Sequence, residues 1–132
     1  MFARPDEKDL AIRVMAMPAD TNAAGDIFGG WLMSQMDMAG SVFARRLARG
    51  RVVTVAVDSF QFKQPVFVGD VISCYATIMR VGNTSITVHV RAFADRQGPS
   101  HNQIQVTEAD LTYVAVDEQR KPRQIPKDDT SM

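Results

Sequence analysis

The sequence has very little cysteine and no excess of charge of either sign. Cys74 is the only cysteine among 132 residues, which excludes an intramolecular disulfide and a metal site built from several cysteines. The 15 Lys and Arg residues balance the 15 Asp and Glu residues. General binders of nucleic acid or anionic membranes need a cationic field, so we expect neither kind of partner. The single cysteine also leads us to expect a reducing compartment.

Long hydrophobic runs are also missing from the sequence. The amino terminus, MFARPDEKDL, has no apolar stretch of signal-peptide length. No run approaches the roughly 20 apolar residues that cross a membrane. His89 and His101 lack the spacing of a metal-binding pair, which disfavours a zinc hydrolase. We therefore predict a soluble cytoplasmic protein without a metal.

The composition favours one folded domain covering residues 1–132. A chain of this length with 45% hydrophobic residues can form a real core, and no internal repeat or linker divides it. Residues 119–132 mix Lys, Arg, Asp and Pro without apolar periodicity. We expect this stretch, from about residue 119, to be a solvated and flexible tail.

The segment 30–50 (GWLMSQMDMAGSVFARRLARG) has the pattern of a long buried helix. Apolar residues leave almost no polar stripe on any side, which is typical of a helix surrounded by protein. Arg45, Arg46 and Arg49 suit the negative end of the helix dipole, and Gly50 can adopt the left-handed conformation of a cap. The helix is therefore expected to end at about Gly50.

Residues after Gly50 are rich in β-branched and aromatic side chains and predict antiparallel strands. Gly82 and Asn83 tolerate the positive φ angles of a two-residue turn, so they should join two strands in a hairpin. A change of apolar phase near Asp58 and Ser59 predicts a bulge. The expected strands are Leu10–Met15, Val52–Phe62, Val71–Val81, 84–93 and 103–116. An α+β fold, with a curved antiparallel sheet around one long central helix, buries that helix most simply.

Asp37 is the most informative residue, because it lies in the middle of the apolar helix. An unpaired buried carboxylate costs several kcal/mol, so it is usually paired, neutralised or kept for function. Its neighbours at helical spacing include no cation, and the small Gly40 and Ser41 leave room for a ligand or another backbone. The alternative is an Asp37 that faces solvent or a subunit interface.

The segment 19–30 (ADTNAAGDIFGG) predicts a shaped loop that leads into the helix. Gly29 and Gly30 stand at the helix start, where free N–H groups favour an oxyanion or a carbonyl oxygen. A packing requirement would explain these glycines equally well. Asp37 lies roughly 10 Å further along the helix axis. A symmetric dimer could bring Asp37 of one subunit to the loop of the other.

The run MPADTNAAGDIFGGWLMSQMD, followed by RVVTVAV, resembles the acyl-CoA thioesterases of the hotdog fold, most closely the short bacterial YciA type. The resemblance extends from about Arg13 to Val116. It implies a sheet wrapped around one helix, dimers joined at their sheet edges, and often a trimer of dimers, which is a hexamer. It also implies hydrolysis of acyl-CoA, within fatty acid metabolism, to a carboxylic acid and CoA, with no cofactor apart from the CoA of the substrate.

The resemblance also assigns roles to three residues of the motif. Asp37 matches the catalytic carboxylate, Asn22 matches an asparagine that binds the thioester or water from the opposite subunit, and the Gly30 N–H matches the group that polarises the thioester carbonyl. Asp37 would either draw a proton from water or attack the thioester to form an anhydride. Hotdog dehydratases use a catalytic histidine. This helix and its loop have none, which disfavours dehydratase chemistry.

Similar proteins place the CoA arm along the turn matched here by residues 80–85 (RVGNTS). Gly82, Asn83, Thr84 and Ser85 are therefore candidate substrate contacts, although an ordinary turn would also explain them. The phosphates need cations, and the candidates are Arg80, Arg120, Lys121 and Arg123, unless these side chains are only solvated. Candidates for the acyl pocket are Phe28, Trp31, Phe60 and Phe62, with core packing as the alternative.

Two other functions fit the same sequence features. A noncatalytic acyl-CoA or lipid sensor would keep the pocket and bind the ester without releasing thiol. A purely structural oligomerisation module would show no change of melting temperature with ligand. The set of Asn22, Gly30 and Asp37 favours the enzyme.

Overall fold

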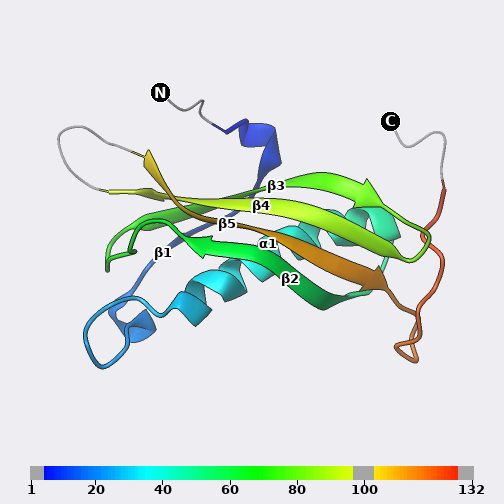
Figure 1. Ribbon diagram of the computed structural model, residues 1–132, viewed down its shortest axis with the longest axis horizontal. Coiled ribbons are helices and arrows are strands. Elements are labelled where there is room, and N and C mark those ends of the chain that lie inside the picture. Colours follow the sequence, from blue (N-terminus) through cyan, green and yellow to red (C-terminus); the bar gives the residue numbers. More distant parts are fainter. Residues whose placement is uncertain (1–4, 97–102, 128–132) are drawn as a thin grey trace.

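The computed structural model describes residues 5–96 and 103–127, which form one α-helix and one antiparallel sheet (Figure 1). The five strands lie in the order β1-β3-β4-β5-β2. Helix α1 crosses one face of the curved sheet, as Figure 1 shows. The elements are β1 (Leu10–Met15), α1 (Gly29–Ala48), β2 (Val52–Phe62), β3 (Val71–Val81), β4 (Ser85–Asp95) and β5 (Gln103–Ala115). The predicted α+β class, the long helix and all five strands are confirmed.

The core lies between α1 and the face of the sheet that it covers. Alternate residues of β4 point into this core, and Ile86, Val88 and Val90 are fully buried. Leu32 and Met36 supply the opposing side chains from α1. The two periodicities, alternate residues on a strand and every third or fourth on a helix, are those on which the sequence interpretation rested.

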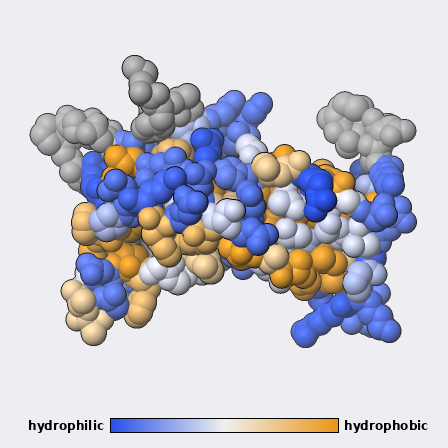
Figure 2. Space-filling view, viewed as in Figure 1, coloured by the Kyte–Doolittle hydropathy of each residue, from blue (hydrophilic) through white to orange (hydrophobic). Residues whose placement is uncertain are grey.

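The helix is not buried on every side within one chain. Met33 and Met38 are 36% and 48% exposed, because the sheet covers α1 from one direction only. Figure 2 shows hydrophobic residues gathered mainly in the lower part of the view, where α1 and β2 lie in Figure 1. In the part of the chain that the structure describes, no helix is long and apolar enough to cross a bilayer.

The end of α1 differs from the expected glycine cap. The residue with the left-handed conformation is Arg49, at φ 56°, and its N–H donates to the carbonyl of Arg45. Gly50 allows the Arg123 side chain to approach the backbone closely, because a Cβ at residue 50 would lie 2.7 Å from a terminal nitrogen of Arg123. That guanidinium donates to the carbonyl of Ala48 at 2.8 Å, so it caps the helix.

The first part of the expected solvated tail is packed against the domain. Ile125 is 2% exposed, and its N–H donates to the carbonyl of Asn83 at 2.7 Å. The Arg123 side chain donates to the carbonyl of Val116 at 3.0 Å. A single apolar residue in a polar stretch gives no periodicity, which is why the sequence did not reveal this contact. Residues 128–132 lie outside the described part of the chain.

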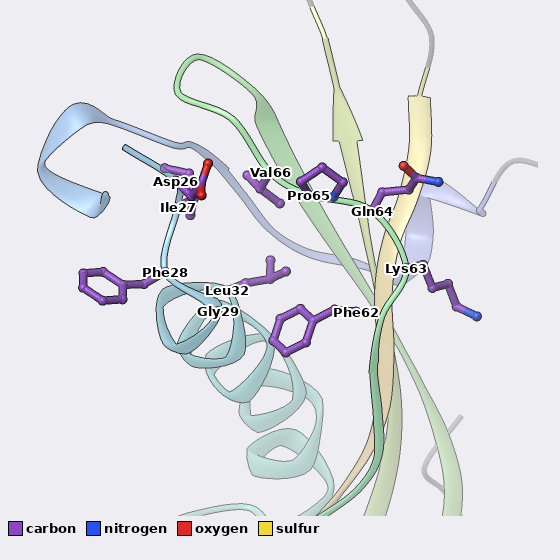
Figure 3. A pocket seen from close by; sticks show the side chains of 10 residues that line it. All are labelled: Asp26, Ile27, Phe28, Gly29, Leu32, Phe62, Lys63, Gln64, Pro65 and Val66. Atoms are coloured by element: carbon purple, nitrogen blue, oxygen red, sulfur yellow. The ribbon is translucent and has the colours of Figure 1, made fainter. Parts of the chain in front are cut away.

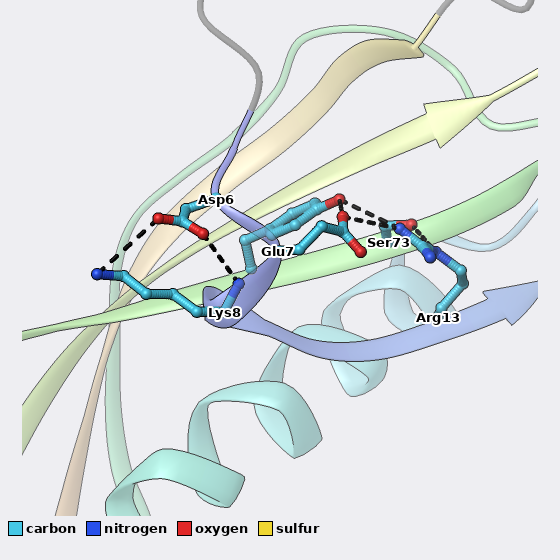
Figure 4. A network of polar contacts seen from close by, with 6 residues as sticks. Asp6, Glu7, Lys8, Arg13 and Ser73 are labelled. Carbon is cyan, nitrogen blue, oxygen red and sulfur yellow. Dashed lines mark hydrogen bonds and ion pairs between the residues drawn. The ribbon is translucent and has the colours of Figure 1, made fainter.

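Hydrogen bonds anchor a short 3₁₀ turn, Glu7–Asp9, to the outer face of the sheet (Figure 4). The carboxylate of Glu7 accepts hydrogen bonds from Tyr75 at 3.0 Å and from Arg13 at 3.4 Å. Arg13 also donates to the hydroxyl of Ser73 at 2.8 Å. This network lies on the side of the sheet opposite α1, as Figure 4 shows.

Strand β2 lies at one edge of the sheet and has an irregular register. It pairs with β5 and is interrupted between Thr54 and Ala56 and again between Asp58 and Gln61. The second interruption confirms the bulge predicted near Asp58, and Ser59 has φ 57° there. The outer side of β2 has no neighbouring strand in the described residues. An edge of this length can pair with a strand of another chain.

We expect Gly40→Ala to destabilise the fold, because Gly40 makes room for Tyr113. The Tyr113 side chain is fully buried, and a Cβ on residue 40 would collide with its hydroxyl. Overpacking of this kind costs about 1–3 kcal/mol, measurable as a loss of unfolding free energy in urea. The same substitution in a Tyr113→Phe background should cost less. Equal costs in the two backgrounds would contradict this explanation.

Candidate active site

Asp37 on α1 and Thr54 on β2 form the centre of the candidate site. The Thr54 hydroxyl donates to a carboxylate oxygen of Asp37 at 2.7 Å. Thr54 directly precedes the first bulge of β2, and bulges commonly redirect side chains next to functional sites. Asp37 is partly buried. This hydrogen bond therefore restricts the orientation of the carboxylate.

Tyr113 fixes the backbone beneath the carboxylate. Its hydroxyl donates to the main-chain carbonyl of Asp37 at 2.7 Å. Burial, and after it the negative charge of Asp37, raises the pKa of Tyr113 above its usual range. Tyr113 consequently stays protonated and remains a donor. The space beside Asp37 that the sequence predicted for a ligand or a backbone, at Gly40, is filled by this tyrosine.

Asn22 is oriented by the tight turn in which it lies. Its side-chain carbonyl accepts the N–H groups of Ala24 at 2.9 Å and Asp26 at 3.1 Å. These two donors fix which end of the amide is oxygen. The amide NH₂ has no hydrogen bond within the described residues. Asn22 can therefore present a donor to a carbonyl oxygen or to water.

Gly30 also presents an accessible donor. It follows the first residue of α1, so its N–H has no intrahelical acceptor. A Cβ built on Gly30 would meet no atom within 4 Å, whereas one on Gly29 would lie 2.8 Å from the Phe62 ring. The two glycines therefore differ: Gly29 makes room for packing, and Gly30 leaves open space over a backbone N–H.

The three predicted catalytic residues are not hydrogen-bonded to one another in the part of the chain that the structure describes. No hydrogen bond joins Asp37 to Asn22 or Gly30 anywhere in residues 5–96 or 103–127. Asp37 is instead connected to the open edge of the sheet through Thr54. That a second copy completes the site stays a prediction.

A pocket of about 530 Å³ lies between the start of α1 and the segment that follows β2 (Figure 3). That volume is in the usual range for small-molecule sites. Figure 3 shows the Phe62 ring beside Gly29 and Leu32, while the side chain of Lys63 extends away from the helix. The lining residues are Asp26, Ile27, Phe28, Gly29, Leu32, Phe62, Lys63, Gln64, Pro65 and Val66.

The predicted pocket aromatics divide between the pocket and the core. Phe28 and Phe62 line the pocket, and both are more than half exposed. Phe60 packs partly against the core, with its ring centroid 4.7 Å from that of Phe62. Trp31 also packs against the core. Phe60 therefore supports the pocket wall through Phe62, without lining the pocket itself.

The predicted hairpin between β3 and β4 is confirmed, with a different turn geometry. The Gly82 N–H donates to the carbonyl of Ser85 at 2.7 Å, and neither Gly82 nor Asn83 has a positive φ. The carbonyl of Thr84 accepts the N–H of Ala115 at 2.8 Å. The backbone of this turn is thus held by its neighbours, while the Asn83 side chain is exposed.

The basic residues proposed for the CoA phosphates differ in availability. Arg80, Arg120 and Lys121 are exposed. Arg123 is occupied at the end of α1, where it holds the carbonyls of Ala48 and Val116. Arg123 therefore has a structural role that the sequence did not predict, and its part in phosphate binding stays a prediction.

The sequence predicts no metal-binding pair from His89 and His101. His89 lies between two carboxylates, with one ring nitrogen 2.7 Å from Asp110 and the other 3.1 Å from Glu108. No cluster of three or more His, Cys, Asp or Glu residues suited to a metal occurs in the described ranges. His101 lies outside them. That the reaction needs no metal stays a prediction.

Comparisons with known proteins indicate one family. A family model described as the thioesterase superfamily matches residues 24–100. The acyl-CoA thioester hydrolase YciA of Escherichia coli (strain K12) is 50% identical over 120 residues, covering 89% of this chain and 91% of that protein.

Solved structures show the same fold. The hexameric hotdog fold thioesterase of Campylobacter jejuni has a TM-score of 0.87 and 47% identity, covering 92% of this chain and 93% of that one. The acyl-CoA hydrolase of Staphylococcus aureus, solved with butyryl coenzyme A and coenzyme A, has a TM-score of 0.78 and 30% identity, covering 89% of this chain and 74% of that one. This chain therefore belongs to the thioesterase superfamily and has the hotdog fold.

Proposed function

We propose that this protein hydrolyses acyl-CoA thioesters to free CoA and a carboxylic acid. The observation that carries the proposal is the Asp37 carboxylate, held by Thr54 at 2.7 Å beside the open edge of the sheet. Relatives about 50% identical over most of the chain are named acyl-CoA thioester hydrolases. Family and geometry therefore indicate the same reaction.

The Staphylococcus aureus hydrolase supports the choice of residues. Its structures include variants in which an asparagine, an aspartate or a threonine is replaced by alanine. The separations between those three positions along its chain equal the separations between Asn22, Asp37 and Thr54 here. We therefore assign Thr54, which the sequence interpretation missed, to the same site as the positioning residue of Asp37.

The proposed chemistry uses the two donors and the carboxylate together. The Gly30 N–H and the Asn22 amide donate to the thioester carbonyl oxygen, or Asn22 holds the water instead. Such donors stabilise the negative charge that develops on that oxygen. Asp37 takes a proton from the attacking water, or attacks the carbonyl carbon itself and forms an anhydride that water then cleaves. In both routes the carbon–sulfur bond breaks, and the thiol of CoA leaves with a proton.

The proposed assembly is a dimer formed by pairing β2 with its copy. Val53 and Val55 on this edge strand are 37% and 56% exposed, and the exposed Met33 and Met38 of α1 would be covered as well. The related Campylobacter jejuni and Yersinia pestis thioesterases are hexameric. A trimer of such dimers is therefore the proposed complete assembly, without nucleic acid or membrane partners, in the cytoplasm.

The CoA arm is proposed to lie along the β3–β4 turn. Gly82, Asn83, Thr84 and Ser85 would contact the pantetheine, and the exposed Arg80, with Arg120 and Lys121, would meet the phosphates. The acyl chain would enter the pocket beside Phe62. CoA itself is part of the substrate, and no further cofactor is proposed.

Hydrolysis of a panel from acetyl-CoA to palmitoyl-CoA, followed by the released thiol, tests the proposal. The enzyme should release one thiol for each thioester consumed and turn over many times. Tight binding of acyl-CoA without thiol release would favour the alternative, a noncatalytic acyl-CoA or lipid sensor. Neither binding nor release would favour a structural module.

A further inference from the structure

Arg96, directly after β4, fastens the connection between β2 and β3 from outside. Its Nε donates to both carboxylate oxygens of Asp70, at 3.3 and 3.2 Å. One of its terminal amino groups donates to the carbonyl of Pro65 at 2.6 Å. The guanidinium carbon also lies 4.6 Å from the centroid of the Phe67 ring. One side chain thus contacts the beginning, the middle and the end of the connection 63–70.

Asp70, the last residue of the connection 63–70, holds the Arg96 guanidinium in place. Its side chain is 6% exposed, so its charge needs partners. Besides Arg96, the carboxylate accepts the N–H of Phe67 at 2.9 Å. The main-chain carbonyl of Asp70 accepts a hydrogen bond from the N–H of Ala16 at 2.9 Å. The pair of Asp70 and Arg96 is consequently anchored to the sheet and holds the rest of the connection in place.

The portion of the connection nearest Arg96 is a wall of the pocket. Gln64, Pro65 and Val66 line it opposite Gly29 and Leu32 of α1 (Figure 3). Proline has no N–H, so the carbonyl is the only backbone group through which Pro65 can be fastened. Arg96 occupies that carbonyl. Gln64 is held separately, because its N–H donates to the carbonyl of Val106 at 3.3 Å. The guanidinium therefore fixes the next part of the wall, at Pro65.

We propose that the Arg96–Asp70 pair sets the acyl-chain selectivity of the enzyme by fixing the Pro65–Val66 wall of the pocket. The inference rests on the proposed function and adds a positioning element to it. Arg96 touches no reacting atom. Its effect reaches the substrate through Pro65. We therefore expect Arg96 to affect binding of the acyl chain, which is apolar and varies in length between substrates.

The test compares Arg96→Met with Arg91→Met across the panel from acetyl-CoA to palmitoyl-CoA. Methionine keeps an apolar stem and removes the donors. Arg91 is a matched control, because it is also an arginine of the β4 region over a phenylalanine ring, Phe93, at 5.6 Å, and it does not line the pocket. We expect Arg96→Met to change the ratio of kcat/KM between long and short substrates by about fivefold or more. The change should arise mainly in KM, and Arg91→Met should keep the wild-type ratio.

Arg96→Lys is a second variant, which keeps the test decisive if Arg96→Met fails to fold. Lysine keeps the charge beside Asp70 but lacks the planar fork that reaches two acceptors. It should melt close to wild type and still shift the selectivity in the same direction. An equal loss of kcat/KM for every substrate, or an unchanged profile in both variants, would overturn the inference. A wild-type protein that hydrolyses no acyl-CoA would instead overturn the proposed function.

Discussion

Asp37→Asn should lower kcat by at least about a hundredfold, which is the usual contribution of a general base. Asparagine keeps the shape of the side chain and can still accept the hydrogen bond from Thr54, but it can neither take a proton from water nor act as a nucleophile. Binding of the substrate should change little, because the polarising donors belong to Asn22 and Gly30. Released thiol, measured at several concentrations of each acyl-CoA, separates kcat from KM.

Thr54→Val and Thr54→Ser are the matched controls for this prediction. Valine removes the 2.7 Å hydrogen bond to Asp37 and keeps the shape, so kcat should fall by about tenfold to a hundredfold, the worth of a bond to a charged group. Serine keeps the hydroxyl and should stay near wild type. If Asp37→Asn retains wild-type turnover while its melting temperature is unchanged, Asp37 does not have the assigned role.

The second large effect is expected from Val53→Asp combined with Val55→Asp at the edge of the sheet. In a symmetric pairing of β2 with its copy, each chain would bring two new carboxylates to the shared edge, and like charges across strands destabilise pairing. The protein should become monomeric by light scattering. Hydrolysis should fall in parallel, because the site would lose the residues supplied by the second chain. Circular dichroism should show that the strands remain.

Val81→Asp controls for the loss of an exposed apolar side chain. Val81 is 48% exposed and ends β3, which two strands separate from β2. This variant should keep the β2-paired dimer in light scattering, which is the readout it controls; its activity is not compared, because residues 80–85 belong to the proposed CoA contact. A double variant at positions 53 and 55 that remains dimeric and fully active would show that β2 is not the dimer edge.

The local pattern of the sequence was sufficient for the elements of the fold. The alternation in β4 and the apolar segment around Asp37 reflect the two basic periodicities, and the structure confirms both elements. The phase change near Asp58 predicted a bulge because one extra residue reverses which side chains face the core. Asp37 was identifiable for a similar reason, since a carboxylate stands out among apolar neighbours.

Contacts between distant residues could not be obtained in this way. Thr54 lies in an ordinary strand sequence, and its importance follows only from its contact with Asp37 on another element. Arg123 and Ile125 look like tail residues, yet a helix end and a hairpin carbonyl hold them. Arg96 and Pro65 are likewise distant in the sequence, and only the folded chain brings them within hydrogen-bond distance. Such pairings depend on the packed fold, in which single polar residues give no periodic signal.

The central claim is that Asp37 of one chain acts with Asn22 of another, and active-site complementation tests it most directly. Asp37→Ala and Asn22→Ala chains, each nearly inactive alone, would be coexpressed with different tags and assayed together. A mixed dimer has one intact site and one doubly defective site, so random pairing should restore about a quarter of the wild-type activity. If the mixture remains as inactive as its two parents while mixed dimers are present, the site is built within a single chain, and the account is wrong.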